Sequence, residues 1–266
     1  MLTVQSFFDL ADFPHRDLFN PRAKAWEPLN DLQAYMNNHE FPSLNRSLIG
    51  DGIPLSGHVI LYGGKAIAGT EAQIEYGDTA KGGLRVFMNG QLLAGASVLM
   101  AGAVLTGDRI DIGPGVLVET GAMIKSPAII GAMTEVRQGA YLRGHCLSGK
   151  RCVIGHTTEV KHAIFMNDAK AGHFAYIGDS ILGNDVNLGA GTKFANLRFL
   201  PGTVTFAHGD ERVDTGRRKF GAILGDQSQT GCNSVTSPGT ILAKCCFLMP
   251  NTTSRASYYP EGTLIR

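Results

Sequence analysis

Three basic residues recur at a constant spacing in the middle of the chain. Lys125, Arg143 and Lys161 lie 18 residues apart, and each directly follows an apolar residue. If 18 residues form one turn of a repeated coil, the three side chains point outward and stack at the strand spacing of about 4.8 Å. Stacked cations repel one another, and the acid nearest to them in sequence is Glu159. We therefore predict a site for an anion such as phosphate, the alternative being a solvated basic edge.

Two interruptions of this repeat contain further groups suited to chemistry. The apolar series steps by ten residues from Met166 to Tyr176, which predicts a loop of about four extra residues carrying Lys170 and His173. An imidazole changes charge near physiological pH and can accept a proton during catalysis. A second loop, predicted from 197 to 220, carries Arg198, Arg212 and the run Arg217-Arg218-Lys219.

A repeat of six residues must position these groups. Every sixth residue from Ile112 to Met166 is apolar except Ser148, and small or modest side chains recur from Val116 to Thr158. The register returns from Leu224 to Leu248, and a weaker lead-in comprises Leu92, Val98, Val104 and Ile110, with a slip of two residues before Ile112. This pattern predicts a parallel β-helix whose coils each contain three short strands and point one apolar residue per hexad inward.

The chain before the repeat differs in character. Residues 26–38 are predicted to form a helix, because Leu29, Leu32, Tyr35 and Met36 share one face. Residues 40–90 place glycine pairs between short apolar runs, which indicates irregular β structure. We therefore expect an N-terminal extension at 1–90 and the β-helix at 91–266.

Composition narrows the class of protein. The chain has 24 basic and 23 acidic residues, so neither nucleic acid nor an anionic membrane is expected as its main partner. The absence of a signal-peptide pattern and of a long apolar run predicts a cytoplasmic protein. Five cysteines without Cys-x-x-Cys spacing disfavour a disulfide framework and a zinc cage. Cys146 and Cys152 occupy small-residue positions of the repeat and are predicted to serve only in packing.

One combination of motifs is specific. It comprises Glu159-Val-Lys161, Lys170-Ala-Gly-His173-Phe-Ala-Tyr176-Ile-Gly-Asp179, Asn187-Leu-Gly-Ala-Gly-Thr192 and Asn196. Over roughly residues 90 to 255 the chain resembles the acetyltransferase half of bacterial and archaeal bifunctional N-acetylglucosamine-1-phosphate uridyltransferases. This resemblance implies a left-handed β-helix that assembles as a homotrimer. It also implies that acetyl-CoA is the acyl donor and that a hexosamine 1-phosphate is the acceptor, with glucosamine 1-phosphate as the first candidate.

The resemblance also implies roles for individual residues. His173 would be the general base, with Glu159 as a candidate to orient it. The substrate-binding residues would be Arg143, Lys161, Tyr176, Asn187 and Asn196. The acetyl-CoA contacts would come from Arg217, Arg218, Lys219 and Cys232.

The chain departs from the family pattern at several points. The uridyltransferase half is not found, so UTP-dependent activity is not expected. After Asn196 the chain reads Leu197-Arg198-Phe199 and has no lysine before Lys219, a form that resembles archaeal-type members. Cys232 and the Met249-Pro250 pair stand where the family has small residues beside the acetyl-CoA channel.

Other functions remain open. Histidines on a β-helix can bind zinc, as in γ-class carbonic anhydrases, but the spacing of His145, His156, His162 and His173 does not follow that family. A catalytically inactive trimeric scaffold or regulatory protein is a second alternative, since function must be argued from the site. A different acyl group or sugar acceptor within the same superfamily is a third.

Overall fold

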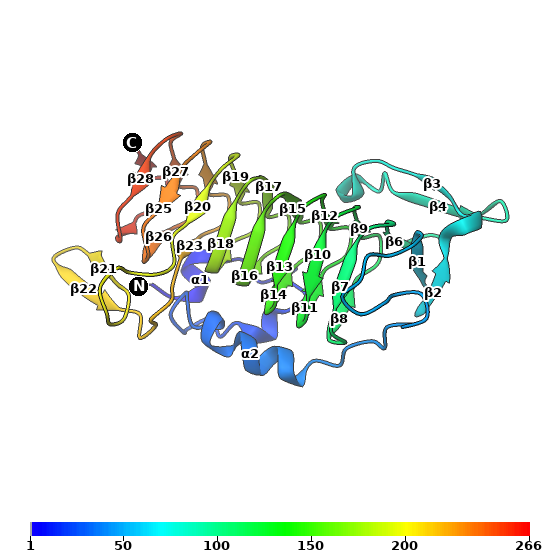
Figure 1. Cartoon of the computed structure of the whole chain (residues 1–266). Coiled ribbons are helices and arrows are strands. Elements are labelled where there is room, and N and C mark those ends of the chain that lie inside the picture. The colour runs from blue at the N-terminus through cyan, green and yellow to red at the C-terminus, as the bar shows by residue number, and fades with distance from the viewer. Residues whose placement is uncertain (1) are drawn as a thin grey trace.

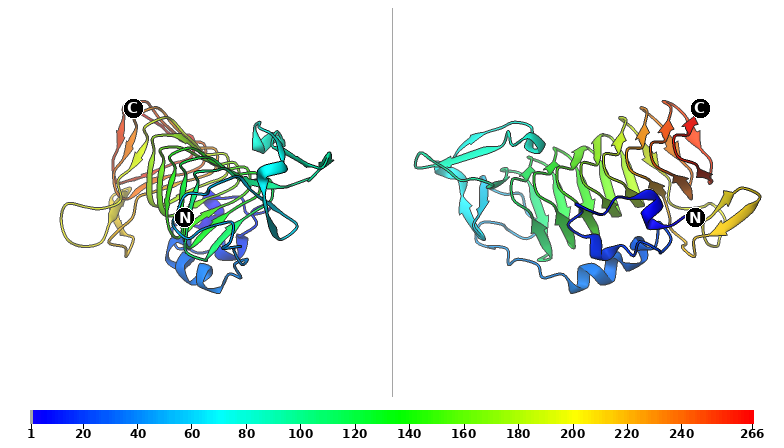
Figure 2. Two further views of the ribbon diagram at one scale, coloured as in Figure 1. Left: turned by 45° about the vertical axis from the view of Figure 1, so that its right-hand side comes forward. Right: turned by 180° about the vertical axis from the view of Figure 1, so that it is seen from behind.

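The computed structural model describes residues 2–266. Its main body is a parallel β-helix in which short strands wind around a triangular prism and each coil packs on the next (Figure 1). The left view of Figure 2 shows the triangular cross-section. The prediction of a mainly β, left-handed parallel β-helix with an N-terminal helical and irregular extension is confirmed.

The prism has three faces. Face 1 contains β6 (Ser97–Leu99), β9 (Leu117–Val118), β12 (Glu135–Val136), β15 (Val153–His156), β17 (Lys170–His173), β19 (Asn187–Leu188), β24 (Gln229–Thr230), β27 (Phe247–Leu248) and β30 (Leu264–Ile265). Face 2 contains β7 (Val104–Thr106), β10 (Met123–Lys125), β13 (Tyr141–Arg143), the first halves of β16 (Glu159–Phe165) and β18 (Tyr176–Leu182), β20 (Lys193–Phe194), β25 (Val235–Thr236) and β28 (Thr253–Ser254). Face 3 contains β8 (Ile110–Ile112), β11 (Ala128–Ile130), β14 (Cys146–Ser148), the second halves of β16 and β18, β23 (Ala222–Leu224), β26 (Thr240–Leu242) and β29 (Tyr258–Tyr259).

Corners connect the faces. Corner A joins face 1 to face 2 and includes His156, His173 and Cys232, and corner B joins face 2 to face 3 and includes His162 and Asp179. Corner C joins face 3 back to face 1.

The hexad pattern builds the core as predicted, except in the lead-in and at the predicted inward positions Met166 and Tyr176. Val118, Ile124 and Leu142 lie in one buried cluster that runs through the prism. In the lead-in, however, Leu99 and Leu105 pair with Val118 and Ile124 and point inward, instead of Val98 and Val104. The predicted register is wrong by one residue there, because Ile112 follows Leu105 by seven positions, not six.

The predicted inserted loop between Asn167 and Ala175 is wrong. Residues Lys170–His173 form β17, which pairs in parallel with β15 at an offset of 17 residues. Val160 and Phe165 are consecutive inward residues only five positions apart, so one residue is missing from this coil. As a result β16 and β18 run through corner B without a separate turn, and Ile177, not Tyr176, points into the core.

The N-terminal extension covers face 3 over several coils (Figure 2, right). It contains α1 (Val4–Phe7), η1 (Arg16–Leu18) and α2 (Pro28–Asn38), which confirms the predicted helix. Leu29, Leu32 and Met36 of α2 are completely buried. They share a hydrophobic cluster with outward residues of face 3, namely Ile129, Leu147, Ile164, Ile181, Ile223 and Ile241.

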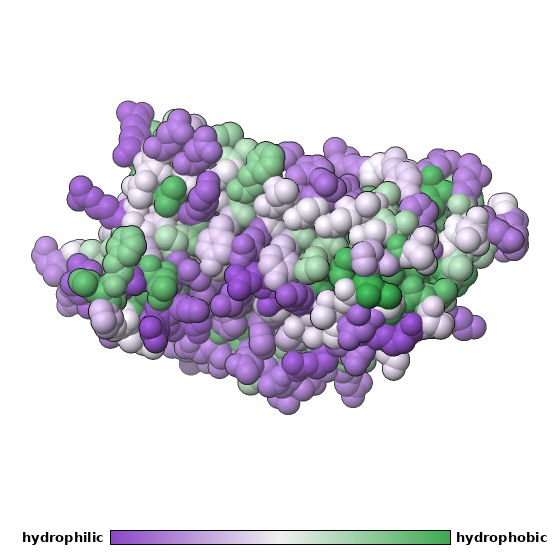
Figure 3. Space-filling model, viewed as in Figure 1, coloured by the Kyte–Doolittle hydropathy of each residue, from purple (hydrophilic) through white to green (hydrophobic). Residues whose placement is uncertain are grey.

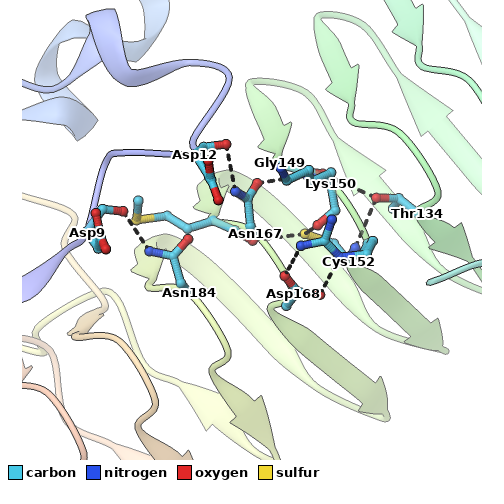
Figure 4. A network of polar contacts seen from close by, with 11 residues as sticks. Asp9, Asp12, Thr134, Gly149, Lys150, Cys152, Asn167, Asp168 and Asn184 are labelled. Carbon is cyan, nitrogen blue, oxygen red and sulfur yellow. Dashed lines mark hydrogen bonds and ion pairs between the residues drawn. The ribbon is translucent and has the colours of Figure 1, made fainter. Parts of the chain in front are cut away.

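Polar contacts fasten this extension to corner C (Figure 4). The Asn167 side-chain amide donates to the Asp12 carbonyl at 3.0 Å, and the Asn184 amide donates to the Asp9 carbonyl at 2.9 Å. The buried carboxylate of Asp226 accepts from the Asp9 backbone N–H at 2.7 Å. The extension is therefore held by both apolar packing and directed hydrogen bonds.

Acid should weaken this attachment through His15. Burial lowers the pKa of His15 from 6.5 to about 4, and its Nδ1 lies 2.9 Å from the Tyr35 hydroxyl. The unfolded chain accepts a proton near pH 6.5 and the folded chain does not, so stability is lost as pH falls from 6.5 to 4. The expected loss between pH 7 and pH 5 is about 2 kcal/mol from this group.

Urea unfolding at both pH values measures this effect. The His15→Gln variant keeps a polar group for Tyr35 but cannot titrate, and should show a smaller difference between pH 7 and pH 5. An equal difference in both proteins would refute the role of His15.

Two excursions leave the prism. Before the coils, β1 (Val59–Tyr62) and β2 (Lys65–Ala68) form a hairpin, and β1 pairs antiparallel with β6 of face 1. A separate antiparallel sheet contains β3 (Gln73–Glu75), β4 (Arg85–Met88) and β5 (Gln91–Leu92), and the 3-10 helices η2 (Gly69–Glu71) and η3 (Thr79–Lys81) lie in the connections. Between β20 and β23 the predicted loop 197–220 projects from corner B and carries the hairpin of β21 (Thr205–His208) and β22 (Glu211–Asp214). We call residues 197–220 the excursion. None of the helices among residues 2–266 is long and apolar enough to cross a membrane.

Candidate active site

The predicted basic column exists on face 2. Lys125 and Arg143 are direct partners in the β10–β13 ladder, and the β13–β16 register places Lys161 in the next position. The Arg143 guanidinium donates to Glu159 at 2.6 Å, which raises the pKa of Arg143. Figure 3 shows a hydrophilic area over β13 and β16, the strands that carry Arg143 and Lys161. Face 2 therefore presents aligned cations, of which Arg143 is already paired with an acid.

Tyr176 and Asn196 complete this surface above a glycine. Gly178 follows Lys161 in the column, because the two are partners in the β16–β18 ladder. A Cβ atom at Gly178 would lie 2.6 Å from the Asn196 side-chain nitrogen and 2.8 Å from the Tyr176 hydroxyl oxygen. Both polar groups thus close over the space that glycine leaves. Burial, with nearby Glu159 and Asp179, raises the pKa of Tyr176, which keeps its hydroxyl as a donor.

Replacing Gly178 with alanine should displace these two groups. Both are ends of flexible side chains, so we expect the fold to remain while apparent affinity for a sugar phosphate falls about threefold to tenfold, as for one lost hydrogen bond. Gly57→Ala is the matched control, because a Cβ there meets nothing within 4 Å. Steady-state KM measurements compare them, and equal KM values in the two variants would contradict the placement.

Asp179 lies buried at corner B. Its carboxylate accepts from Asn196 Nδ2 at 2.7 Å and from an Arg217 Nη at 3.3 Å, and it lies 3.5 Å from His162 Nδ1. Burial lowers the pKa of His162 to about 4 despite this carboxylate. His162 is therefore neutral at pH 7, and Arg217 supplies the positive charge that balances Asp179.

Lys161 faces Lys219 across the root of the excursion. Burial lowers the pKa of Lys161, and repulsion from the Lys219 ammonium lowers it further. Two ammonium groups held close together favour an anion between them, since its charge removes their repulsion. Lys219 was predicted from the sequence as an acetyl-CoA contact, and its position beside Lys161 also suits the sugar phosphate.

His173 lies at the other edge of face 2. It ends β17 at corner A, three residues before Tyr176, and is exposed to solvent. Its ring stacks on His156 of the preceding coil at a centroid distance of 5.6 Å. Glu159 pairs with Arg143, and the hydrogen bonds among residues 2–266 include none between Glu159 and His173. In this structure no hydrogen bond therefore supports the predicted role of Glu159 in orienting His173.

The remaining predicted residues are spread more widely. Asn187 is exposed on face 1 beside Lys170 of β17, away from the column on face 2. Arg218 and Lys219 are exposed, whereas Arg217 turns inward to Asp179 and to Asn30 of α2, at 2.6 Å. Cys232 is exposed at corner A, where the β17–β19–β24 registers place it two coils beyond His173. The cysteines predicted to pack, Cys146 and Cys152, are buried, and burial raises the pKa of each thiol to about 12.

The histidines that could have bound zinc occur as two pairs. His145 and His162 have ring centroids 5.9 Å apart, and His156 and His173 form the stack described above. Residues 2–266 contain no group of three His, Cys, Asp or Glu side chains placed to hold a metal ion.

Sequence reasoning missed Gly178 and Asp179 as parts of the site. Both belong to the Tyr176-Ile-Gly-Asp179 motif, so a signal for them was present. Their roles depend on the excursion, which returns to corner B after more than 20 residues, and no local spacing predicts which side chains it brings there.

Comparison with known proteins bears on this arrangement. The chain is 36% identical over 149 residues to a bifunctional sugar-1-phosphate nucleotidylyltransferase/acetyltransferase of Sulfurisphaera tokodaii, covering 54% of this chain and 37% of that protein. It is 33% identical over 132 residues to the bifunctional protein GlmU of Methanococcus vannielii, covering 47% and 32%, respectively. The GlmU of a Cyanothece species is 35% identical over 146 residues, covering 52% and 28%.

The chain is homologous to bifunctional GlmU proteins over about half its length. Its stacked coils are consistent with the acetyltransferase half of GlmU. No protein-family model matches the chain. The chain spans about a third of the length of the GlmU relatives it matches. The chain is thus similar to part of proteins one of which is named for transfer reactions of sugar 1-phosphates.

Proposed function

We propose that this protein transfers the acetyl group of acetyl-CoA to the amine of a hexosamine 1-phosphate, with glucosamine 1-phosphate as the first candidate. The observation that carries the proposal is the polar surface of face 2 and corner B, where Arg143 and Lys161 share a column, Lys219 lies beside Lys161, and Tyr176 and Asn196 close over Gly178. Such a surface suits a phosphate monoester joined to a hydroxyl-rich ring. The homology to proteins named acetyltransferases supports the same reaction.

In this reaction the amine nitrogen attacks the thioester carbonyl carbon. A C–N bond forms, the C–S bond breaks, and His173 accepts the proton that the amine loses. The proton then passes to the departing sulfur, so that the products are the amide and free CoA thiol. Lys161, Lys219 and Arg143 hold the phosphate, while Tyr176, Asn196 and Asn187 contact the sugar.

Acetyl-CoA would be the second substrate. Arg218 is an exposed cation on the excursion and could contact its phosphates, and Cys232 lies on the same corner as His173. The Arg217 guanidinium donates to Asp179 and Asn30, so Arg217 is not proposed as an acetyl-CoA contact.

We further propose that the protein acts as a homotrimer in the cytoplasm, with residues 91–266 as the acyltransferase domain and 1–90 as a supporting extension. Face 3 is covered by the extension, and Thr79 and Val86 cover the first coils of face 1, which leaves corner A, face 2 and the later coils of face 1 for a neighbouring subunit. Exposed apolar residues of the excursion, Leu197, Phe199 and Leu200, suit such a contact, and apolar side chains are visible there in Figure 3.

Incubation with acetyl-CoA and a panel of amino-sugar phosphates, with free thiol measured over time, tests the function. Thiol release with glucosamine 1-phosphate, and not with its N-acetylated form, is the expected result. Binding of acetyl-CoA without turnover of any amine would instead favour the inactive scaffold. Sedimentation of the purified protein tests the trimer separately.

A further inference from the structure

A single buried carboxylate connects the coil to both ends of the excursion. The Asp179 side chain accepts from Asn196, the last residue before the excursion, and from Arg217 near its end. The Asp179 backbone carbonyl accepts from the Gly221 N–H at 2.9 Å, and the Asn196 carbonyl accepts from the Phe220 N–H at 2.9 Å. Both ends of the excursion are therefore held by Asp179 at corner B.

The same contacts set the direction of groups that face the substrate surface. Asn196 Nδ2 lies over Gly178 beside the Tyr176 hydroxyl while it donates to Asp179. Arg217 reaches from Asp179 to Asn30 of α2, and its Nε donates to the Lys219 carbonyl at 3.2 Å. Asp179 thus fixes Asn196 directly and fixes the backbone of Lys219 through Arg217.

We propose that Asp179 is a positioning residue that assembles the binding surface for the sugar phosphate by holding Asn196 and the Arg217–Lys219 segment. It does not itself contact substrate, because its side chain is only 7% exposed and its oxygens are engaged by these donors. This inference rests on the proposed function for the identity of the substrate. The geometry on which it depends is independent of the reaction.

Asp179→Asn is the first variant. Asparagine has the same size and tolerates the left-handed backbone found here, with φ of 49°. It removes the charge that balances Arg217 and gives up an acceptor. Asp168→Asn is the matched control, because Asp168 also has a left-handed backbone, with φ of 62°, and accepts from Arg151 at 2.6 Å, but at corner C. Arg217→Gln, made alone and together with Asp179→Asn, removes the contact between Asp179 and the Arg217–Lys219 segment from the other side.

Two measurements separate positioning from general stability. Hydrogen exchange should become faster in residues 197–221 of Asp179→Asn and stay unchanged there in Asp168→Asn. With acetyl-CoA saturating, KM for glucosamine 1-phosphate should rise about tenfold in Asp179→Asn with kcat largely kept. The double variant should be no worse than Asp179→Asn alone, since Asp179→Asn already breaks the linkage through Arg217.

The inference is wrong if exchange and KM are unchanged in Asp179→Asn, or if Asp168→Asn raises KM equally. Faster exchange without a change in KM would also overturn it, because Asp179 would then be only structural. If the wild-type protein acetylates no amino-sugar phosphate, the proposed function fails, and the affinity for inorganic phosphate replaces KM. A tenfold loss of phosphate affinity in Asp179→Asn then supports the inference, and equal or absent phosphate binding in both proteins contradicts it.

Discussion

Replacement of His173 with alanine is expected to lower kcat for acetyl transfer roughly 10²- to 10⁴-fold, the usual contribution of a general base. The amine of a hexosamine must lose a proton as it attacks the thioester, and His173 is an exposed imidazole at the edge of face 2, beside the proposed substrate surface. Its side chain makes no core contact, so the fold should survive the change. Both substrates should still bind, because the cations and Asn196 are untouched. Stopped or continuous thiol assays give kcat, and calorimetry gives the affinities.

His156→Ala is the matched control. His156 is the ladder partner of His173, one coil earlier on corner A, and stacks on the same ring. It should lose far less activity than His173→Ala. Wild-type turnover by a folded His173→Ala protein with glucosamine 1-phosphate at neutral pH would show that another group accepts the proton.

The second large effect is expected at Lys161. Truncation to alanine removes a charge-assisted contact worth roughly 1.5–3 kcal/mol, so affinity for the sugar phosphate should fall about 10- to 150-fold. Lys161 is only partly exposed and has Lys219 beside it. A bound phosphate would satisfy both ammonium groups. Affinity for acetyl-CoA should change much less, and calorimetric titration of each substrate measures the difference.

Lys125→Ala tests whether the column acts as a defined site. Lys125 occupies the same column two coils earlier, where its ammonium group lies 5.2 Å from the centroid of the Tyr141 ring. It should matter less than Lys161, and Arg143→Ala should lie between them because Glu159 already balances part of its charge. Equal losses at all three positions would indicate general electrostatic attraction instead.

The sequence predicted the prism well because one inward side chain per hexad is a local pattern. The sequence mispredicted the coil that contains His173. One residue is missing between Val160 and Phe165, and in the apolar spacing this deletion looked like an insertion between Met166 and Tyr176. The error arose because Met166 is apolar and completely buried, but against the N-terminal extension and not in the prism. Where a face is covered, residues that point into the prism and residues that point outward are both apolar, so apolar spacing alone does not distinguish them.

The candidate site was predictable only in part. The 18-residue spacing identified Lys125, Arg143 and Lys161 as a column, and the ladder registers place them so. Asp179 and the inward turn of Arg217 were not predictable, since they depend on where a long excursion returns. Asn187 lies on a different face from the column. Its contact with substrate stays a prediction, and it would involve a site shared with a neighbouring subunit.

The attachment of the N-terminal extension has a consequence for synthesis of the chain. Phe7 and Phe8 precede all of the coils in the sequence, yet the Phe7 carbonyl accepts from the Asp226 N–H and the Phe7 ring packs against Tyr258. Coils can form one after another as they emerge from the ribosome, because each needs only its neighbour. This aromatic segment must therefore wait until the coils that carry Asp226 and Tyr258 exist. During that interval it is an exposed apolar segment, and the newly made protein should be most prone to aggregation just before those coils are complete.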